Sequence, residues 1–280
     1  MCSSDLDGAG EVVAVGPGVT RFKPGDRVAG CFMQAWPGGA IDDASFASAM
    51  GGAIDGMLAE RVVLEEDGAV RLPDHLSFEE GATLPCAGVT AWHALVEIGQ
   101  LKAGDRVLVQ GSGGVSIFAL QFARLMGARV VATSGSAAKA ERLKALGAET
   151  VIDYRKTPDW DQAVLAHTGG RGVDLTVEVG GAGTLPRSFQ ATRIGGRIAV
   201  IGLLTGPGAQ VDPMPILRRN LRVQGLYVGN RQMFEAMNAA IAAGGLKPVI
   251  DRAFPFAAAP DAYRHLKSQN HFGKIVITHG

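Results

Sequence analysis

The sequence predicts an α/β protein with a doubly wound parallel sheet of six strands, preceded by a smaller β-rich region. Short apolar runs alternate with helical stretches through the middle of the chain, which is typical of a parallel sheet covered on both faces. One strand–turn–helix junction within this alternation is rich in glycine. The six strand candidates are Val107–Gln110, Arg129–Thr133, Thr150–Asp153, Val173–Val179, Arg197–Gly202 and Arg222–Val228.

The glycine-rich junction reads Val-Leu-Val-Gln-Gly-Ser-Gly-Gly-Val from Val107 to Val115. Free N–H groups and the dipole at the start of the following helix favour a bound phosphate. The third position of the G-x-G-x-x-G pattern holds Ser116, a small residue in place of the usual glycine. The residues expected to contact a diphosphate are Gly111, Ser112, Gly113, Gly114 and Val115.

An isolated glycine turn is also compatible with an ordinary strand–helix connection, so its context matters. Apolar residues including Phe118, Phe122 and Leu125 fall on one helical face after the turn. Gly127 then stands where a helix cap belongs, and Arg129–Thr133 follows as a second strand. This β-α-β unit predicts dinucleotide binding.

The composition is typical of a globular protein and gives no sign of a nucleic-acid or membrane partner. Of 280 residues, 47% are hydrophobic and 19% are charged, and the formal net charge is zero. We therefore expect no nucleic-acid or membrane partner. The start of the chain does not resemble a signal peptide, and Cys2, Cys31 and Cys86 share no close spacing. These features favour a cytoplasmic protein without disulfides.

Outside the predicted sheet, shorter elements are expected at both ends of the chain. We interpret Trp36–Gly56, which is rich in glycine, alanine and serine, as a long loop. Expected strands are Gly10–Gly16, a run ending at Val28, Ala59–Leu64, Lys247–Phe256 and Lys274–Thr278. Expected helices are Gln232–Ala243 and Pro260–Ser268.

Several segments together resemble the medium-chain dehydrogenase/reductase superfamily, in its zinc-independent branch of alcohol dehydrogenase-like and quinone oxidoreductase-like proteins. The segments are Asp7–Val12, Val15–Gly16, Lys23–Val28, Leu84–Trp92, Gly111–Ser116 and Phe272–Val276. The resemblance implies three parts. They are a GroES-like catalytic domain over residues 1–88, a Rossmann domain over 89–243, and a return to the catalytic domain over 244–280.

The resemblance also bears on the start of the chain. Only Met1 to Leu6 precede the Asp-Gly-Ala-Gly segment, whereas family members carry further opening strands there. We therefore expect an N-terminally truncated GroES-like domain with unpaired strand edges and uncertain activity.

Zinc ligation is not expected. A catalytic zinc takes about three protein ligands. Where the zinc enzymes of the superfamily carry a His-Glu pair, this chain has Leu6-Asp7. Cys86 stands at the position of a later ligand and is interpreted as a buried thiol. A zinc-type alcohol dehydrogenase remains an alternative hypothesis, and His93 is interpreted as a helix-face residue.

The cofactor expected is NADP(H), with NAD(H) as the less favoured alternative. The second strand ends Thr-Ser-Gly-Ser, with no carboxylate to bind an adenosine ribose or to repel a 2′-phosphate. Ser134, Ser136 and Lys139 make a donor-rich pocket there, which Arg142 and Arg155 can supplement. By resemblance, Tyr154 lies beside the same phosphate.

The resemblance implies further cofactor contacts, each of which would by itself be an ordinary turn. These contacts are Gly180, Gly181, Ile201, Gly202, Tyr227, Val228 and Lys274. Thr90 is the candidate catalytic residue, because it is expected near the nicotinamide. Asp42 and Asp43 are interpreted as solvated loop residues.

The resulting hypothesis is an oxidoreductase that transfers a hydride between the nicotinamide and a small carbonyl, quinone or activated alkene, without zinc. The alternatives are a non-catalytic nucleotide-binding protein or inactive fragment, and the zinc enzyme named above. The resemblance also implies a homodimer formed through Arg222–Val228.

Overall fold

The computed structural model describes residues 6–206, 208 and 210–279, and these residues form two compact units. We call Thr90–Tyr227 the sheet unit. The residues up to Val89 and from Val228 onward form the split unit. Residues 228–243, which the predicted Rossmann domain includes, belong to the split unit by their contacts, and the predicted domain boundaries stay a prediction.

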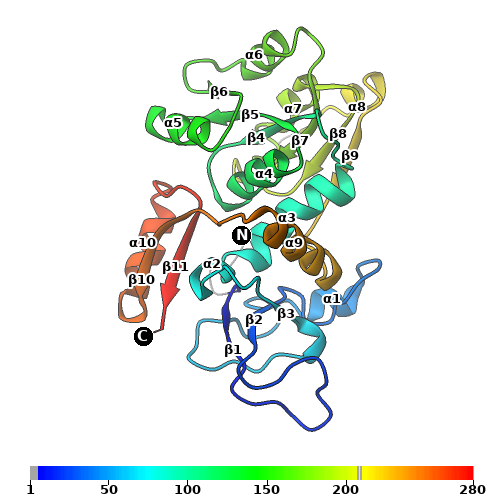
Figure 1. Ribbon diagram of the computed structural model, residues 1–280. Coiled ribbons are helices and arrows are strands. Elements are labelled where there is room, and N and C mark those ends of the chain that lie inside the picture. Colours follow the sequence, from blue (N-terminus) through cyan, green and yellow to red (C-terminus); the bar gives the residue numbers. More distant parts are fainter. Residues whose placement is uncertain (1–5, 207, 209, 280) are drawn as a thin grey trace. The chain divides into compact units, whose positions relative to one another are not determined.

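The sheet unit carries one parallel sheet of six strands in the order β6-β5-β4-β7-β8-β9 (Figure 1). This order reverses direction at β4, which is the strand order of doubly wound dinucleotide-binding domains. The α/β prediction and the six predicted strands are confirmed, with ends shifted by a few residues. The strands are β4 (Arg106–Gln110), β5 (Arg129–Ser134), β6 (Thr150–Asp153), β7 (Val173–Glu178), β8 (Thr192–Val200) and β9 (Arg222–Gly225).

Helices connect these parallel strands. Helices α4 and α5 pack on β4, β5 and β6, whereas α6 and α7 pack against each other. The chain crosses from β4 to β5 and β6 in one direction, and from β6 back to β7 and on to β8 in the other. Because right-handed crossovers in opposite directions lie on opposite faces, α4 and α5 cover one face of the sheet and α6 and α7 the other. The helices are α3 (Val89–Trp92), η3 (His93–Ile98), α4 (Gly114–Leu125), α5 (Ala137–Ala145), α6 (Trp160–His167), α7 (Leu185–Ala191) and α8 (Met214–Arg218).

The core of the sheet unit follows the apolar pattern of the sequence. Phe118 and Phe122 of α4 are almost fully buried, and each contributes roughly 1.5–3 kcal/mol by leaving water. Leu125, which the sequence places on the same face, is 39% exposed because it lies in the last turn of the helix. Gly127 has a φ of +78°, as its predicted capping role requires.

The split unit contains a three-stranded antiparallel sheet in the order β1-β2-β3 and a separate parallel pair, β10-β11. Its strands are β1 (Ala9–Glu11), β2 (Arg27–Gly30), β3 (Ala69–Arg71), β10 (Ile250–Pro255) and β11 (Lys274–Thr278). Its helices are α1 (Asp43–Ala47), η1 (Glu66–Gly68), α2 (Phe78–Gly81), η2 (Leu84–Gly88), α9 (Arg231–Gly244), η4 (Phe256–Ala258) and α10 (Ala259–Lys267).

The strand predicted over Ala59–Leu64 is wrong. That segment is irregular, Val63 is 98% exposed, and the strand forms instead at Ala69–Arg71, where it pairs with β2. An apolar run forms a strand only where a partner edge and a buried face meet it. The strand predicted over Gly10–Gly16 also shortens to Ala9–Glu11, and Val13 and Val15 are exposed.

Candidate cofactor site

The loop after β4 forms a cradle of backbone amides at the sheet's carboxyl edge. Gly111 has a φ of +74°, which glycine adopts without the strain other residues would incur. Gly113 is the N-cap residue of α4, and no side chain caps the helix there. A Cβ built on Gly111 or on Gly113 would meet no protein atom within 4 Å. The amide-rich opening of α4 therefore faces free space that an anion can occupy.

The substitution of serine for the third glycine of the motif has a structural explanation. The Ser116 hydroxyl donates a 2.7 Å hydrogen bond to the backbone carbonyl of Gln110, and the side chain is 2% exposed. This bond links the first turn of α4 to the end of β4, so the buried serine stabilises the conformation of the loop between them. Ser112 is buried as well.

The end of β5 gathers hydroxyl and guanidinium groups. A Cβ on Gly135 would stand 2.6 Å from the Tyr154 hydroxyl oxygen and 2.9 Å from Arg155 Nε, so both side chains lie against this turn. Ser136 caps α5 by accepting from the Lys139 amide, and the Ser134 hydroxyl lies 3.2 Å from the Ser136 amide nitrogen. The Ser134 hydroxyl also donates to the Ser136 carbonyl at 3.1 Å, so it shapes this turn. The fold thus brings Tyr154 and Arg155, which follow β6, to the turn after β5.

The loops after β7 and β8 touch each other at the same end of the sheet, where the carboxyl ends of the strands lie. A Cβ on Gly202 would lie 2.6 Å from the Val179 carbonyl oxygen, and one on Gly181 would lie 3.1 Å from that of Gly202. The Thr205 amide donates to the Gly180 carbonyl at 2.9 Å. Only glycine permits this close approach of backbone at positions 181 and 202.

Two polar residues at this edge were missed by the sequence reasoning. Gln110 ends β4 and Glu178 ends β7, and their side chains are 7% and 0% exposed. Gln110 Nε2 donates to Glu178 Oε2 at 2.7 Å across the point where the strand order reverses. The available signal was a polar residue at the last position of each strand, directly before the loops predicted to bind the cofactor.

The remaining candidates are divided between the units. Thr90 is buried on α3 in the sheet unit, between two π-helical segments, a feature often found at functional sites. Tyr227 ends the sheet unit and is 51% exposed. Val228 has a φ of +54°, a strained value for a β-branched residue. The contacts predicted for these residues stay predictions.

Lys274 has a carboxylate partner within the split unit. Its ammonium lies 3.1 Å from Asp7 Oδ2, and both side chains are mostly buried. Burial raises the pKa of Asp7, although the neighbouring ammonium opposes this shift. The buried ion pair joins the start of β11 to the segment before β1, and Lys274's predicted contact with the cofactor stays a prediction.

Leu6 and Cys86, which stand where zinc enzymes of the superfamily carry ligands, lie among the described residues of the split unit. Leu6, which carries no ligand atom, is buried, and no three His, Cys, Asp or Glu side chains cluster among the described residues. Cys86 is buried, as expected of a packed thiol. Burial raises the pKa of Cys31 to about 12, so its thiol is protonated at neutral pH.

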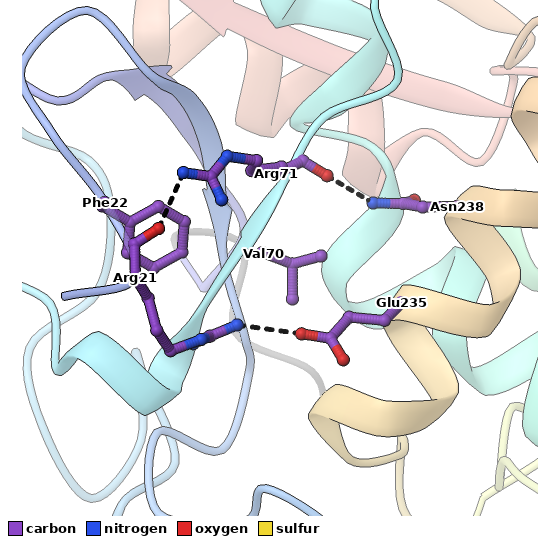
Figure 2. Close-up of a pocket in the computed structure, with 6 residues that line it drawn as sticks. All are labelled: Arg21, Phe22, Val70, Arg71, Glu235 and Asn238. Atoms are coloured by element: carbon purple, nitrogen blue, oxygen red, sulfur yellow. Dashed lines mark hydrogen bonds and ion pairs between the residues drawn. The ribbon is translucent and has the colours of Figure 1, made fainter.

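A small cavity of about 190 Å³ also lies in the split unit, beside β3 and α9 (Figure 2). The Arg21 and Arg71 guanidinium groups each lie 5.0 Å from the centre of the Phe22 ring. Arg21 Nη2 pairs with Glu235 at 2.8 Å, and Asn238 donates to the Arg71 carbonyl. These contacts hold α9 against β3, which is a structural role.

The polar loops of the split unit also have structural roles. Asp42, predicted to be a solvated loop residue, caps α1 by accepting from the amide and hydroxyl of Ser45, and the latter contact measures 2.7 Å. Of the described residues, none belongs to a helix long and apolar enough to cross a membrane.

Two family models match the chain. The alcohol dehydrogenase GroES-like domain matches residues 4–74, and the zinc-binding dehydrogenase model matches residues 114–243. The chain is 43% identical over 277 residues to the zinc-type alcohol dehydrogenase-like protein C1773.06c of Schizosaccharomyces pombe, covering 97% of this chain and 80% of that protein. The chain therefore belongs to the medium-chain dehydrogenase/reductase superfamily, as the sequence predicted.

Solved structures agree with this assignment. An NAD-dependent alcohol dehydrogenase superimposes with a TM-score of 0.88 at 36% identity, covering 98% of this chain and 82% of that one. The 2-octenoyl-CoA carboxylase reductase CinF, in complex with NADP and 2-octenoyl-CoA, superimposes with a TM-score of 0.86 at 28% identity, covering 97% and 66%. Quinone oxidoreductases are also among the matches. The chain is accordingly an NAD(P)-dependent oxidoreductase by family.

Proposed function

We propose that this protein prefers NADP(H) and transfers a hydride, without zinc, between the nicotinamide and a small carbonyl, quinone or activated alkene. The convergence of Ser136, Tyr154 and Arg155 at the end of β5 carries the proposal, because hydroxyl and guanidinium groups suit a 2′-phosphate, and Ser134 shapes the turn that presents them. The residues that end β5 and follow it, Thr133–Ser136, include no acid, which is the position where an acid would repel that phosphate; Asp153, the partner of Ser134 on β6, accepts from the amides of Arg155 and Lys156.

The rest of the sheet edge supplies the other cofactor contacts in this proposal. The opening of α4 binds the diphosphate through its amides, and the touching loops after β7 and β8 present backbone to the ribose of the nicotinamide half. The bound nicotinamide supplies or accepts the hydride. Thr90 is assigned to the reacting end as a hydroxyl that can hold a proton or donate to a carbonyl oxygen.

Zinc independence rests on the ligand positions. Leu6 offers no donor atom, and the neighbouring Asp7 is already paired with Lys274. An activated alkene conjugated to a carbonyl needs only a hydrogen-bond donor at its oxygen during hydride addition. The relative solved with NADP and an enoyl thioester favours this substrate class.

Cofactor titration tests the proposal directly. Protein fluorescence is followed as NADPH or NADH is added, and NADPH is expected to bind at least tenfold more tightly than NADH. Turnover is then measured with an enone, a quinone and an aldehyde, with and without a chelator. Equal affinity for both cofactors would contradict the phosphate pocket, and loss of turnover with chelator would contradict zinc independence.

A second candidate, a non-catalytic nucleotide-binding protein, gives a different result in the same experiment. It predicts tight NADPH binding with no turnover of any acceptor. Binding without turnover is compatible with the fold, because the sheet unit by itself contains the amide cradle and the candidate phosphate pocket.

We also propose a homodimer formed through β9, and a cytoplasmic location consistent with the cysteine usage. β9 is an edge strand, and exposed apolar side chains lie in neighbouring segments of the sheet unit. These side chains are Leu203, Leu204, Met214, Leu217 and Tyr227. Light scattering tests the assembly: a monomeric mass at micromolar concentration would contradict it.

A further inference from the structure

Glu178 is a buried carboxylate that accepts hydrogen bonds from several segments of the sheet unit at once. Its Oε1 accepts from the amides of Gly180 and Gly181, at 2.8 and 3.0 Å, and from the Thr184 hydroxyl at 2.5 Å. Its Oε2 accepts from Gln110 Nε2 and from the Ser188 hydroxyl. Glu178 has no exposed surface.

Gln110 completes this arrangement from the neighbouring strand. Its Oε1 accepts from the amides of Val179 and Gly180 at 3.2 and 3.3 Å, while its Nε2 donates to Glu178 and to Ser188. Its backbone carbonyl accepts from Ser116, which belongs to the first turn of α4. Each oxygen therefore faces donors, and the amide nitrogen faces acceptors.

The backbone of Glu178 extends these connections to the loop after β8. Its carbonyl accepts from the Ile201 amide at 2.8 Å and from the Gly202 amide at 3.4 Å. Two residues thus fasten together the three loops that the proposed function assigns to the diphosphate and the ribose. We call Gln110 and Glu178 the switch-point pair, since β4 and β7 are the strands between which the order reverses.

We propose that the switch-point pair is a positioning device that holds the diphosphate loop and the ribose loop at the spacing a dinucleotide requires. This inference rests on the proposed function. The glycines of these loops provide close approach but no rigidity of their own, because glycine restricts its backbone least. A fully satisfied buried polar network supplies that rigidity before the cofactor arrives, which lowers the ordering cost of binding.

The pair makes a sharp chemical prediction, because the two side chains have the same shape and opposite hydrogen-bonding roles. In Glu178→Gln, the new side-chain NH₂ group faces the NH₂ group of the Gln110 side chain. Rotating the Gln110 side chain by half a turn removes that conflict but places its NH₂ group against the backbone N–H groups of Val179 and Gly180. Either orientation leaves donor against donor. In Gln110→Glu, two carboxylates abut.

The double exchange, Gln110→Glu with Glu178→Gln, restores every match. The new carboxylate accepts from the Val179 and Gly180 amides, and the new amide donates to it while accepting from Gly180, Gly181 and Thr184. We expect each single variant to weaken NADPH binding about tenfold, and the double variant to return to within about threefold of the parent chain.

Thr176→Val provides a matched control in the same strand. Thr176 is 0% exposed and hydrogen-bonds Thr192 at 2.7 Å, and it contacts none of the three loops through that bond. This variant removes a buried polar contact of β7, and we expect NADPH affinity within about twofold of the parent.

The experiment measures two quantities on each variant of the 280-residue chain. They are NADPH affinity, followed by fluorescence, and hydrogen exchange of the Val179–Gly181 backbone amides without cofactor. The proposal expects faster exchange and weaker binding in both single variants only, with recovery in the double variant. Unchanged exchange in the single variants, or no recovery in the double variant, overturns it. Absence of NADPH binding by the parent chain would refute the proposed function, and the exchange measurement would still judge whether the pair holds the loops.

Discussion

Ser136 offers a way to reverse the proposed cofactor preference while leaving the fold intact. It follows β5 and caps α5 by accepting from the Lys139 amide. Aspartate is as good an N-cap as serine, and its charge suits a helix N-terminus. Ser136→Asp therefore places a carboxylate beside the proposed phosphate pocket with little change in the free energy of unfolding.

The expected loss of NADPH affinity follows from charge repulsion. Ser136 is half-buried, so an effective dielectric constant of about 40–80 applies between the new carboxylate and a 2′-phosphate with roughly two negative charges. At a separation of about 6 Å the repulsion is about 1.5–3 kcal/mol, or roughly a tenfold to hundredfold weaker affinity. NADH lacks this phosphate, so its affinity is expected to change less than about threefold.

Ser136→Asn is the matched control, because asparagine caps a helix equally well and carries no charge. Both variants are titrated with NADPH and NADH by fluorescence, and thermal unfolding confirms that the cap is intact. The reasoning fails if Ser136→Asp binds NADPH as tightly as Ser136→Asn does. It also fails if NADH affinity falls in parallel with NADPH affinity.

Three further predictions concern other parts of the molecule. Gly113→Ala places a Cβ in the open space beside the amide cradle, so NADPH and NADH affinity should fall by the same factor in fluorescence titrations; unequal factors would argue against a shared diphosphate site. Burial raises the pKa of Asp174, but hydrogen bonds from Arg171, the Arg106 amide and Arg193 lower it to about 2. Above about pH 4 the ionised Asp174 carboxylate therefore adds about 2 kcal/mol to the free energy of unfolding. Urea unfolding should show this contribution being lost as the pH falls from about 4 to about 2, and Asp174→Asn should show no such loss. Cys31, with its pKa of about 12, should resist iodoacetamide at pH 8 until urea is added; labelling of the native protein, located by mass spectrometry, would contradict its burial.

The strand–glycine–helix junction and the six alternating strands were predictable from the sequence, because both signals are local. A buried parallel strand needs a continuous apolar run, and the turn at Gly111 needs a residue that tolerates positive φ. The family resemblance placed these segments in order, and the comparisons confirm the superfamily. The small antiparallel sheet was predicted less well, because its strands are short and depend on their partners.

The amino-acid sequence by itself determined the α/β class, the amide cradle at the opening of α4 and the absence of an acid after β5. Only the tertiary structure decided that Tyr154 and Arg155 lie against Gly135, and that Gln110 and Glu178 join three loops. Local patterns specify a helix or strand through the period of its apolar side chains, which neighbouring residues alone set. Contacts between residues 68 positions apart depend on which strands become neighbours, and the packing of the whole sheet settles that order.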